Sequence, residues 1–498
     1  MRTGYTLGLC HHTLCCFGFL IVLGAQAGWR GGGALKNRYK EHEFLAACQE
    51  GNCPVVKSYL TMEGFDPNEK RISGCSGVAV TGLYRAAGGG HPEAARMLIA
   101  AGADINSGCV DGATPLFVAS ENGHTKMVRM LVRFGADLEQ GCHDGATPLF
   151  MASQEGYADI VRILAEAGAD VDRSRHDEIT PLFMACQNGH TEVVRILFAA
   201  GVDSAKSRRD GAVPLLMASQ NGHAEVVRIL IEAGADIDQS CGGGATALFV
   251  ASQHGHVEVV RTLVAGGADP DRVCNNESTP LFAASQNGHA EVVRILCQAR
   301  VNLDWSREDG ATSLLMASQN GHPEAVRILV TAGADLALGC RDKTTPLLMA
   351  SQNGHAEVVS ILVAAGVDPD QSKRNGLTPL FMASQEGHAE VVSILVAAGV
   401  DLDQGKRSGA TPLFIASQEG HAQVVRILIE SGANPSIPWR PLHPWGLNFF
   451  RRTALAQARH MKLMTAWSKS AKRRAYSDII SVLAQTPKYT VTPVSRKM

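Results

Sequence analysis

The sequence predicts an all-α solenoid of short helix–turn–helix repeats, and three observations predict it. A block beginning Thr-Pro-Leu-Phe returns every 33 residues, as at Thr147 and Thr180. A Gly-His pair keeps the same step, as at His190 and His223. The chain holds 51 glycines but only 5% aromatic residues, which favours frequent chain reversals and a core of small aliphatic side chains. A period of this length indicates one stacked array in place of the roughly three domains that 498 residues would otherwise suggest.

One repeat shows how each element is predicted. Thr147 is a good N-cap and Pro148 suits the first helical position, so a first helix begins here and Gly156 ends it. The apolar spacing over 159–167 predicts a second helix, which Gly168 ends. Each helix has about two turns, which is too short for stability in isolation. Each repeat must therefore bury its apolar face against its neighbours.

This pattern resembles the ankyrin-repeat family, whose repeats have 33 residues, two helices and a protruding β-turn finger. The resemblance covers about residues 41–483 and implies an ankyrin-repeat solenoid of helix–turn–helix units with β-turn fingers. It also implies a concave binding surface made by the fingers and the first helices. Two positions depart from the family pattern. Phe150 stands where the family has His, so apolar packing replaces a polar interaction, and Ser153 stands where the family has Ala.

We expect five parts along the chain. They are a signal peptide or short membrane anchor (1–27), a linker (28–40), a solenoid of about 12 repeats with a degenerate first one (41–434), an atypical capping unit with a Pro/Trp insertion (435–484) and a basic disordered tail (485–498). Extra residues within 71–80 are expected to extend the first finger. The aromatic residues Trp439, Trp445, Phe449 and Phe450 are expected to seal the last repeat, with a ligand site as the alternative.

The N-terminus and the cysteines favour different compartments. A short apolar run at 14–23 follows Arg2 and precedes Ala25-Gln26-Ala27, which is typical of a secretory signal peptide, and a membrane segment over 6–27 is the alternative. Several cysteines share one finger column, where stacked repeats lie too far apart for disulfides, so we expect free thiols and a reducing compartment. They are Cys109, Cys142, Cys241, Cys274 and Cys340. The localisation stays open between the cytoplasm, which is slightly favoured, and the secretory route or a membrane anchor.

The sequence contains none of the motifs that would indicate catalysis. It lacks a His-Glu-x-x-His pair, a phosphate loop ending in Gly-Lys-Ser/Thr and a Gly-x-Ser-x-Gly elbow. The Gly-His histidines occur once per repeat, too far apart to share a metal ion, and we expect them to start the second helices and bond to neighbouring backbone. The sequence therefore predicts no enzyme, catalytic residue, metal, cofactor or small-molecule substrate.

The charge is divided unevenly along the chain. The net charge is −2, which excludes a chain dominated by nucleic-acid-binding charge, so no nucleic-acid partner is expected. From Pro435 onward the chain carries twelve Lys or Arg residues and one acidic residue. Within this basic region, 472–474 reads Lys-Arg-Arg, which indicates a solvated helix end or, alternatively, a nuclear address.

The candidate protein-binding residues lie on the fingers and the first helices. The finger tips vary most and form a discontinuous basic stripe, in which Arg residues are suited to anchor a partner, although each alone also fits a solvated turn. Trp305 is a candidate hot spot if exposed and a filler if buried. The first helices add a uniform Gln column, which suits an extended or repetitive ligand or reflects repeat duplication alone. The tip residues are His143, His176, Arg209, Glu308, Arg341, Arg374 and Arg407, and the column includes Gln154, Gln187, Gln220 and Gln253.

These residues predict a non-enzymatic scaffold or adaptor that binds unidentified protein partners through the concave surface and finger tips. The alternative is a secreted or membrane-anchored adaptor or effector that acts through the N-terminal apolar segment.

Overall fold

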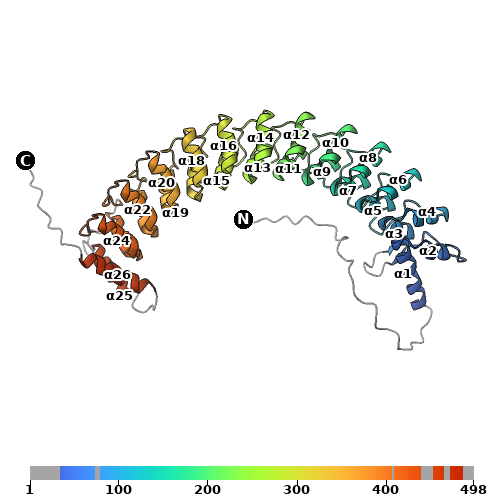
Figure 1. Ribbon diagram of the computed structural model, residues 1–498, viewed down its shortest axis with the longest axis horizontal. Coiled ribbons are helices and arrows are strands. Elements are labelled where there is room, and N and C mark those ends of the chain that lie inside the picture. Colours follow the sequence, from blue (N-terminus) through green and yellow to red (C-terminus); the bar gives the residue numbers. More distant parts are fainter. Residues whose placement is uncertain (1–33, 73–78, 407–408, 439–452, 465–470, 486–498) are drawn as a thin grey trace, which may run out of the picture. The chain divides into compact units, whose positions relative to one another are not determined.

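The computed structural model describes residues 34–72, 79–406, 409–438, 453–464 and 471–485, without the side chains of 34–41, 464 and 471–473. In these ranges the chain forms twenty-six α-helices and one two-stranded sheet, which confirms the predicted all-α class (Figure 1). The chain divides into two compact units, Met1–Pro214 and Leu215–Met498, and each is described by itself.

The helices of the first compact unit come in pairs, one pair per repeat. First helices pack against the first helices of the neighbouring repeats, and second helices pack against second helices. The pairs are α1 (Ala34–Glu50) with α2 (Cys53–Leu60), α3 (Gly82–Gly88) with α4 (Pro92–Ala100), α5 (Pro115–Glu121) with α6 (Thr125–Arg133), α7 (Pro148–Glu155) with α8 (Ala158–Glu166), and α9 (Pro181–Asn188) with α10 (Thr191–Ala199).

The second compact unit repeats this arrangement with the same two layers of helices. Its first pair begins at the boundary between the compact units. The pairs are α11 (Pro214–Gln220) with α12 (Ala224–Glu232), α13 (Ala247–His254) with α14 (Val257–Ala265), α15 (Pro280–Asn287) with α16 (Ala290–Gln298), α17 (Ser313–Asn320) with α18 (Pro323–Ala332), α19 (Pro346–Asn353) with α20 (Ala356–Ala364), α21 (Pro379–Glu386) with α22 (Ala389–Ala397), α23 (Pro412–Glu419) with α24 (Ala422–Glu430), and α25 (Ala454–Met464) with α26 (Ala471–Gln485).

The first helices begin and end where the sequence predicts. Thr147 Oγ1 accepts the backbone N–H of Phe150 at 3.2 Å, which satisfies one of the unpaired donors at the start of α7. Gly156 ends this helix with a φ of 82°, a left-handed conformation that favours glycine. The second helix, α8, begins at Ala158, one residue before the predicted start.

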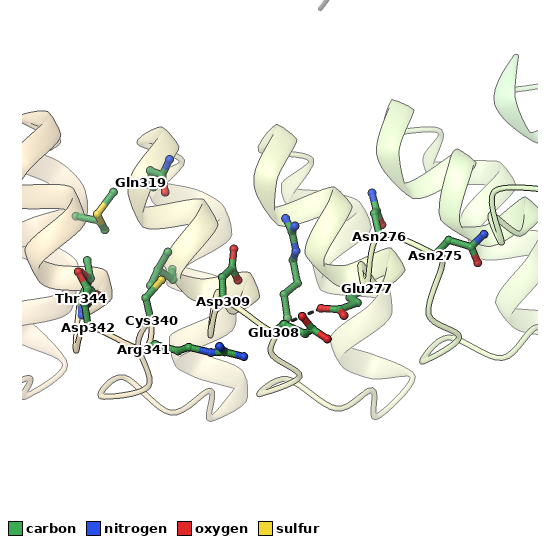
Figure 2. A pocket seen from close by; sticks show the side chains of 13 residues that line it. Asn275, Asn276, Glu277, Glu308, Asp309, Gln319, Cys340, Arg341, Asp342 and Thr344 are labelled. Atoms are coloured by element: carbon green, nitrogen blue, oxygen red, sulfur yellow. Dashed lines mark hydrogen bonds between the residues drawn. The ribbon is translucent and has the colours of Figure 1, made fainter.

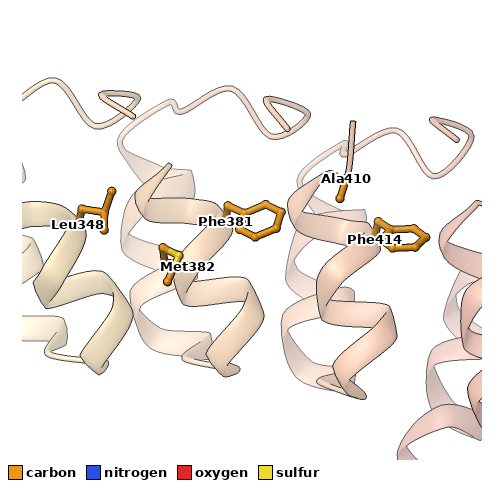
Figure 3. Close-up of a cluster of buried hydrophobic side chains, with 5 residues drawn as sticks. All are labelled: Leu348, Phe381, Met382, Ala410 and Phe414. Carbon is orange, nitrogen blue, oxygen red and sulfur yellow. The ribbon is translucent and has the colours of Figure 1, made fainter. Parts of the chain in front are cut away.

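The core lies between the helices of adjacent repeats and is built mainly from aliphatic side chains. Most of its aromatic members are Phe residues at the fourth position of the Thr-Pro-Leu-Phe block, as the apolar packing of this position predicts, and Phe44, Tyr59 and Tyr476 are buried in the end repeats. One cluster joins three successive repeats through Leu348, Phe381, Met382, Ala410 and Phe414, all of them buried (Figure 3). Since these side chains contact the next repeat, each short helix gains its stability from stacking.

The Gly-His histidines join each repeat to the one before it, as predicted. His289 Nε2 donates to the backbone oxygen of Gln253 at 3.0 Å, and the carbonyl acceptor fixes the tautomer. Tyr476 of α26 makes the equivalent bond at the far end, to the backbone oxygen of Gln418 at 2.7 Å. The bond recurs at 2.8–3.1 Å for His124, His190, His256, His289, His322, His355, His388 and His421.

The ends of the array depart from the regular repeat. The first finger is extended by a hairpin in which β1 (Arg71–Ile72) pairs antiparallel with β2 (Ala79–Val80), within the stretch that the sequence singled out. Helix α1 begins at Ala34, inside the stretch expected to be a linker. The four aromatic residues expected to seal the last repeat lie outside the described residues, as do segments 1–27 and 485–498 apart from Gln485.

Nine cysteines are described and all nine are free thiols, as expected for the finger column. Burial raises the pKa of Cys48 to about 12 and that of Cys297 to about 11. These thiols therefore stay protonated and unreactive near neutral pH. The remaining cysteines lie outside the described residues. In the described ranges, no helix is both long enough and apolar enough to cross a bilayer, and the candidate segment 6–27 is not among them.

Candidate protein-binding surface

Each finger is a tight turn that is held by its own backbone and by the finger before it. In the finger at 142–146, the N–H of Cys142 donates to the backbone oxygen of Ala146 at 3.1 Å, and Gly145 closes the turn with a φ of 87°. The N–H of the tip residue His143 donates to the backbone oxygen of Asp111 at 3.0 Å. The backbone of the tip is therefore fixed, and its side chain is left to face solvent.

The predicted tip residues of the described chain are all exposed. Arg341 and Arg374 repeat the finger-to-finger bond, since their N–H groups donate to the backbone oxygens of Asp309 and Asp342 at 3.2 Å. The structure thus places successive tips one repeat apart along each compact unit. The exposed tips are His143, His176, Arg209, Glu308, Arg341 and Arg374. Arg407 lies outside the described residues.

The tip arginines differ in how much of their charge is already paired. Arg209 donates through Nε to Glu178 at 3.2 Å, a pair whose side chains are 72% and 50% exposed. Exposed pairs of this kind contribute about 0–1 kcal/mol, so Arg209 can exchange partners at little cost. The guanidinium groups of Arg341 and Arg374 make no hydrogen bond or ion pair within the described part of the chain.

The arginines that precede the tips are partly buried against the first helices, with side chains 29% exposed in Arg175 and 36% exposed in Arg208. The guanidinium of Arg175 lies 5.6 Å from the ring centroid of Phe150, and Arg208 lies 5.9 Å from Phe183 in the same way. This cation–π contact joins a finger to the first helix of the preceding repeat. These arginines therefore brace the fingers, and their charge is less available to a partner than that of the tip arginines.

Two of these arginines also close an ion pair within their own finger. Arg175 Nε donates to Asp177 at 3.1 Å and Arg208 Nε donates to Asp210 at 3.0 Å, each with a second bond from Nη2. The hydrogen bonds from Arg208 lower the pKa of the Asp210 carboxyl against the opposing effect of burial. These ion pairs were not predicted from the sequence, although the spacing Arg-x-Asp is compatible with them.

Trp305 is half-buried between two fingers. Its Nε1–H donates to the backbone oxygen of Glu277, in the preceding finger, at 3.2 Å. Arg300, five residues earlier, takes a left-handed backbone with a φ of 61° where the other repeats have glycine. The indole is thus tied to the neighbouring finger, and only part of it is offered to a partner.

The backbone oxygens of the Gln column accept hydrogen bonds from the following repeat. The oxygen of Gln154 accepts from both His190 Nε2 and Asn188 Nδ2 at 2.9 Å, and its side chain donates to Glu155 at 2.9 Å. The side chains of Gln187 and Gln220 are half-buried and that of Gln253 is exposed. A polar column along the first helices is therefore present beside the fingers.

The second compact unit contains a pocket of about 780 Å³ between three successive fingers (Figure 2). The fingers contribute residues 275–277, 307–309 and 340–342 to its lining. Leu315 of α17 and Met349 of α19 add apolar surface. This pocket was not predicted from the sequence. In the described residues, no group of three or more His, Cys, Asp or Glu side chains gathers in a way that would hold a metal ion.

Comparison with known proteins places this architecture in a family. The family model for ankyrin repeats in three copies matches residues 44–142, 83–175, 134–207, 171–241, 238–305, 299–373 and 347–438. These segments span well over half of the chain, and the chain belongs to the ankyrin-repeat family. Ankyrin repeats are generally protein–protein interaction modules, and the family is typically non-enzymatic.

Two further comparisons complete these findings. No curated protein matches the chain. Among solved structures, the crystal structure of the human ASB11 ankyrin repeat domain is 25% identical, with a TM-score of 0.41. The match covers 45% of this chain and 99% of that chain.

Proposed function

We propose that this chain is a non-enzymatic scaffold or adaptor that binds a protein partner through its fingers and first helices. The observation that carries the proposal is the row of exposed tips on fixed backbone, such as Arg341 and Arg374. Because these tips are ordered before a partner arrives, binding does not have to order the finger backbone. Ankyrin repeats generally bind proteins, which supports the same conclusion.

Arginine is the side chain best suited to anchor such a contact. It is enriched at the residues that dominate interface energies, and its planar guanidinium binds carboxylates in a bidentate way. Arg209, Arg341 and Arg374 are exposed, and the charge of the last two is unpaired in the described chain. We propose them as the principal contacts, with His143, His176 and the first-helix glutamines beside them.

The experiment uses the full-length chain as bait for affinity capture and mass spectrometry, followed by binding measurements with the purified partner. A variant with Arg209, Arg341 and Arg374 all changed to Ala is expected to weaken binding at least tenfold. The matched control changes three exposed arginines of the second helices α14, α16 and α18 to Ala. These are Arg261, Arg294 and Arg327, whose ion pairs are all exposed.

The control variant removes the same charge and is expected to keep the affinity of the original chain. Equal loss in both variants would show that net charge alone drives binding. Unchanged binding in the finger variant would overturn the proposed surface.

The cellular compartment in which this binding occurs is a separate proposal, and it rests on the sequence of residues 1–27. If that segment is a cleaved signal, the adaptor acts after secretion, and the mature chain begins at Gly28. Sequencing the N-terminus of the purified native protein decides between this alternative and a chain that keeps its first residues.

A further inference from the structure

The finger at 307–309 has the Arg-x-Asp spacing of two other fingers but lacks their ion pair. Arg175 and Arg208 each donate two hydrogen bonds to the Asp two residues on. Arg307 lies over the ring of Phe282 at 5.6 Å, as those arginines lie over their own Phe. Its side chain nevertheless makes no hydrogen bond or ion pair with any described residue, and its Nε is fully buried.

A buried N–H without an acceptor is costly, because water can no longer satisfy it. Asp309, the potential partner of Arg307, accepts the N–H of Ala311 at 2.9 Å, as Asp210 accepts that of Ala212 at 3.1 Å, but it accepts no bond from its arginine. Arg307 lines the pocket, and the Nη groups of its guanidinium also lack an acceptor in the described chain, so a group that enters the pocket can supply one to them.

The pocket opens where the regular contact between fingers is interrupted. The N–H of Glu308 donates to the Glu277 carboxylate at 2.7 Å, whereas the N–H of Arg341 donates to a backbone oxygen of the preceding finger (Figure 2). Glu277 stands in a glycine column with a φ of 60°, an uncommon backbone for a side chain of this size. Its carboxylate is held between the two fingers, and residues of both fingers line the pocket beside it.

The pocket has unused hydrogen-bond donors although its lining is acidic. The lining contains four carboxylates and two guanidinium groups, and three of the carboxylates, those of Glu277, Asp309 and Asp342, already accept backbone N–H groups. Asp342 also lies 3.5 Å from Lys373. The guanidinium groups of Arg307 and Arg341 are not engaged in the described chain. The pocket therefore offers unused donors to an acceptor that carries negative charge.

The charge of the anion is limited by its neighbours. Glu308 is exposed at the finger tip and repels any anion, and because this repulsion grows with charge, it disfavours a phosphate more than a single carboxylate. Met349, which is only partly buried, offers apolar contact in the same pocket, whereas Leu315 beneath it is 2% exposed. A single carboxylate with an apolar neighbour fits both conditions.

We propose that this pocket binds one Asp or Glu side chain from an extended segment of the protein partner. The carboxylate bonds to Arg307 and Arg341, and the adjoining apolar residue contacts Met349. The inference rests on the proposed function and specifies the chemistry of the partner segment at this part of the surface.

The test measures fluorescence anisotropy with the full-length chain and short amidated peptides of Ala, Leu and Ser. One peptide carries a central Glu, and otherwise identical peptides carry a central Gln, Lys or phosphoserine. The Glu peptide is expected to bind at least tenfold more tightly than the other three. Arg307→Ala is expected to remove this preference, whereas Arg294→Ala, an exposed arginine of α16 outside the pocket, is expected to keep it.

Glu277→Gly separates binding from stability. Glycine tolerates the positive φ better, so this variant is expected to unfold at higher temperature and yet to bind the Glu peptide less tightly, because the contact that spaces the two fingers is gone. A general loss of folding cannot produce that combination.

Four results would overturn the inference. They are equal binding of the Glu and Gln peptides, preference for the Lys or phosphoserine peptide, an unchanged preference in Arg307→Ala, and no binding of any peptide. The proposed function would survive each of them, because it is tested by the captured partner and the finger-tip variant and not by these peptides.

Discussion

The first helices and the fingers belong to the same repeats, but they vary in different ways. Thr147 and Thr279 each accept the N–H of the Phe three residues on at 3.2 Å, although four repeats separate them. The fingers that follow differ, since Arg175 is paired with an Asp and Arg307 is not. The comparison teaches that the constant residues of the helices determine stacking, whereas the residues of the fingers can vary and are available for recognition.

The largest expected effect lies in the helical layers. Leu296 of α16 is completely buried, so Leu296→Ala should cost about 2–5 kcal/mol of unfolding free energy through lost burial and a cavity. Leu338, in a finger, is 37% exposed, and Leu338→Ala should change stability by less than about 0.5 kcal/mol. Urea denaturation followed by circular dichroism measures both. Equal effects would contradict the assignment of stability to the helices.

A smaller effect is expected where a hydrogen bond joins two repeats. Tyr476→Phe removes the hydroxyl that donates to the Gln418 carbonyl at 2.7 Å and should cost about 1 kcal/mol. The increase in amide hydrogen exchange should be confined to α26 and its neighbours. His421→Ala, which removes the equivalent bond to Gln385 at 2.9 Å, should have its effect one repeat earlier. Increased exchange throughout the compact unit would show that the repeats do not unfold locally.

Two matched substitutions test the left-handed backbone position at the end of the second helices. Arg300 has a φ of 61° in a column of glycines, so Arg300→Gly should stabilise the chain by about 1 kcal/mol. Gly267 has a φ of 91° with open space around a Cβ, so Gly267→Ala should cost about 1 kcal/mol from the backbone alone. Thermal denaturation measures both signs. Destabilisation by Arg300→Gly would indicate that the Arg side chain contributes contacts that outweigh its backbone cost.

The smallest effect concerns pH and the paired fingers. The pKa of Asp210 is lowered by its bonds to Arg208, so its stabilising contribution is present above the unfolded pKa of about 3.9 and is lost as the pH falls through the lowered value. The pair is partly exposed, so screening limits its contribution to about 0.2–1 kcal/mol. Asp210→Asn should remove this acid dependence from the exchange rates of its finger. The same dependence in both proteins would exclude Asp210 as its source.

The repeat fold could be predicted because its determinants are local. A cap such as Thr147, a Pro at the next position and a left-handed Gly156 define each first helix within ten residues of sequence. The bond from each His to the preceding repeat follows from one constant spacing. The start of α1 at Ala34 could not be predicted, since no Thr-Pro block precedes it.

The exposed tips could be predicted from turn chemistry, but the pocket could not. It depends on the Glu277 carboxylate, which meets the N–H of Glu308, 31 residues further on, only because the fingers of successive repeats stack side by side. It also depends on the missing bond between Arg307 and Asp309, although the sequence Arg-Glu-Asp at 307–309 has the same Arg-x-Asp spacing as the fingers that form this bond. The finger at 307–309 and the paired fingers therefore differ in side-chain conformation and not in residue type.

The most direct test of the division between helices and fingers measures affinity and stability on the same variants. The finger variant with Arg209, Arg341 and Arg374 changed to Ala should bind the captured partner at least tenfold more weakly and keep its Tm. The second-helix variant with Arg261, Arg294 and Arg327 changed to Ala should keep its affinity. If both variants bind alike, or if the finger variant loses affinity only with its stability, the fingers are not the recognition surface.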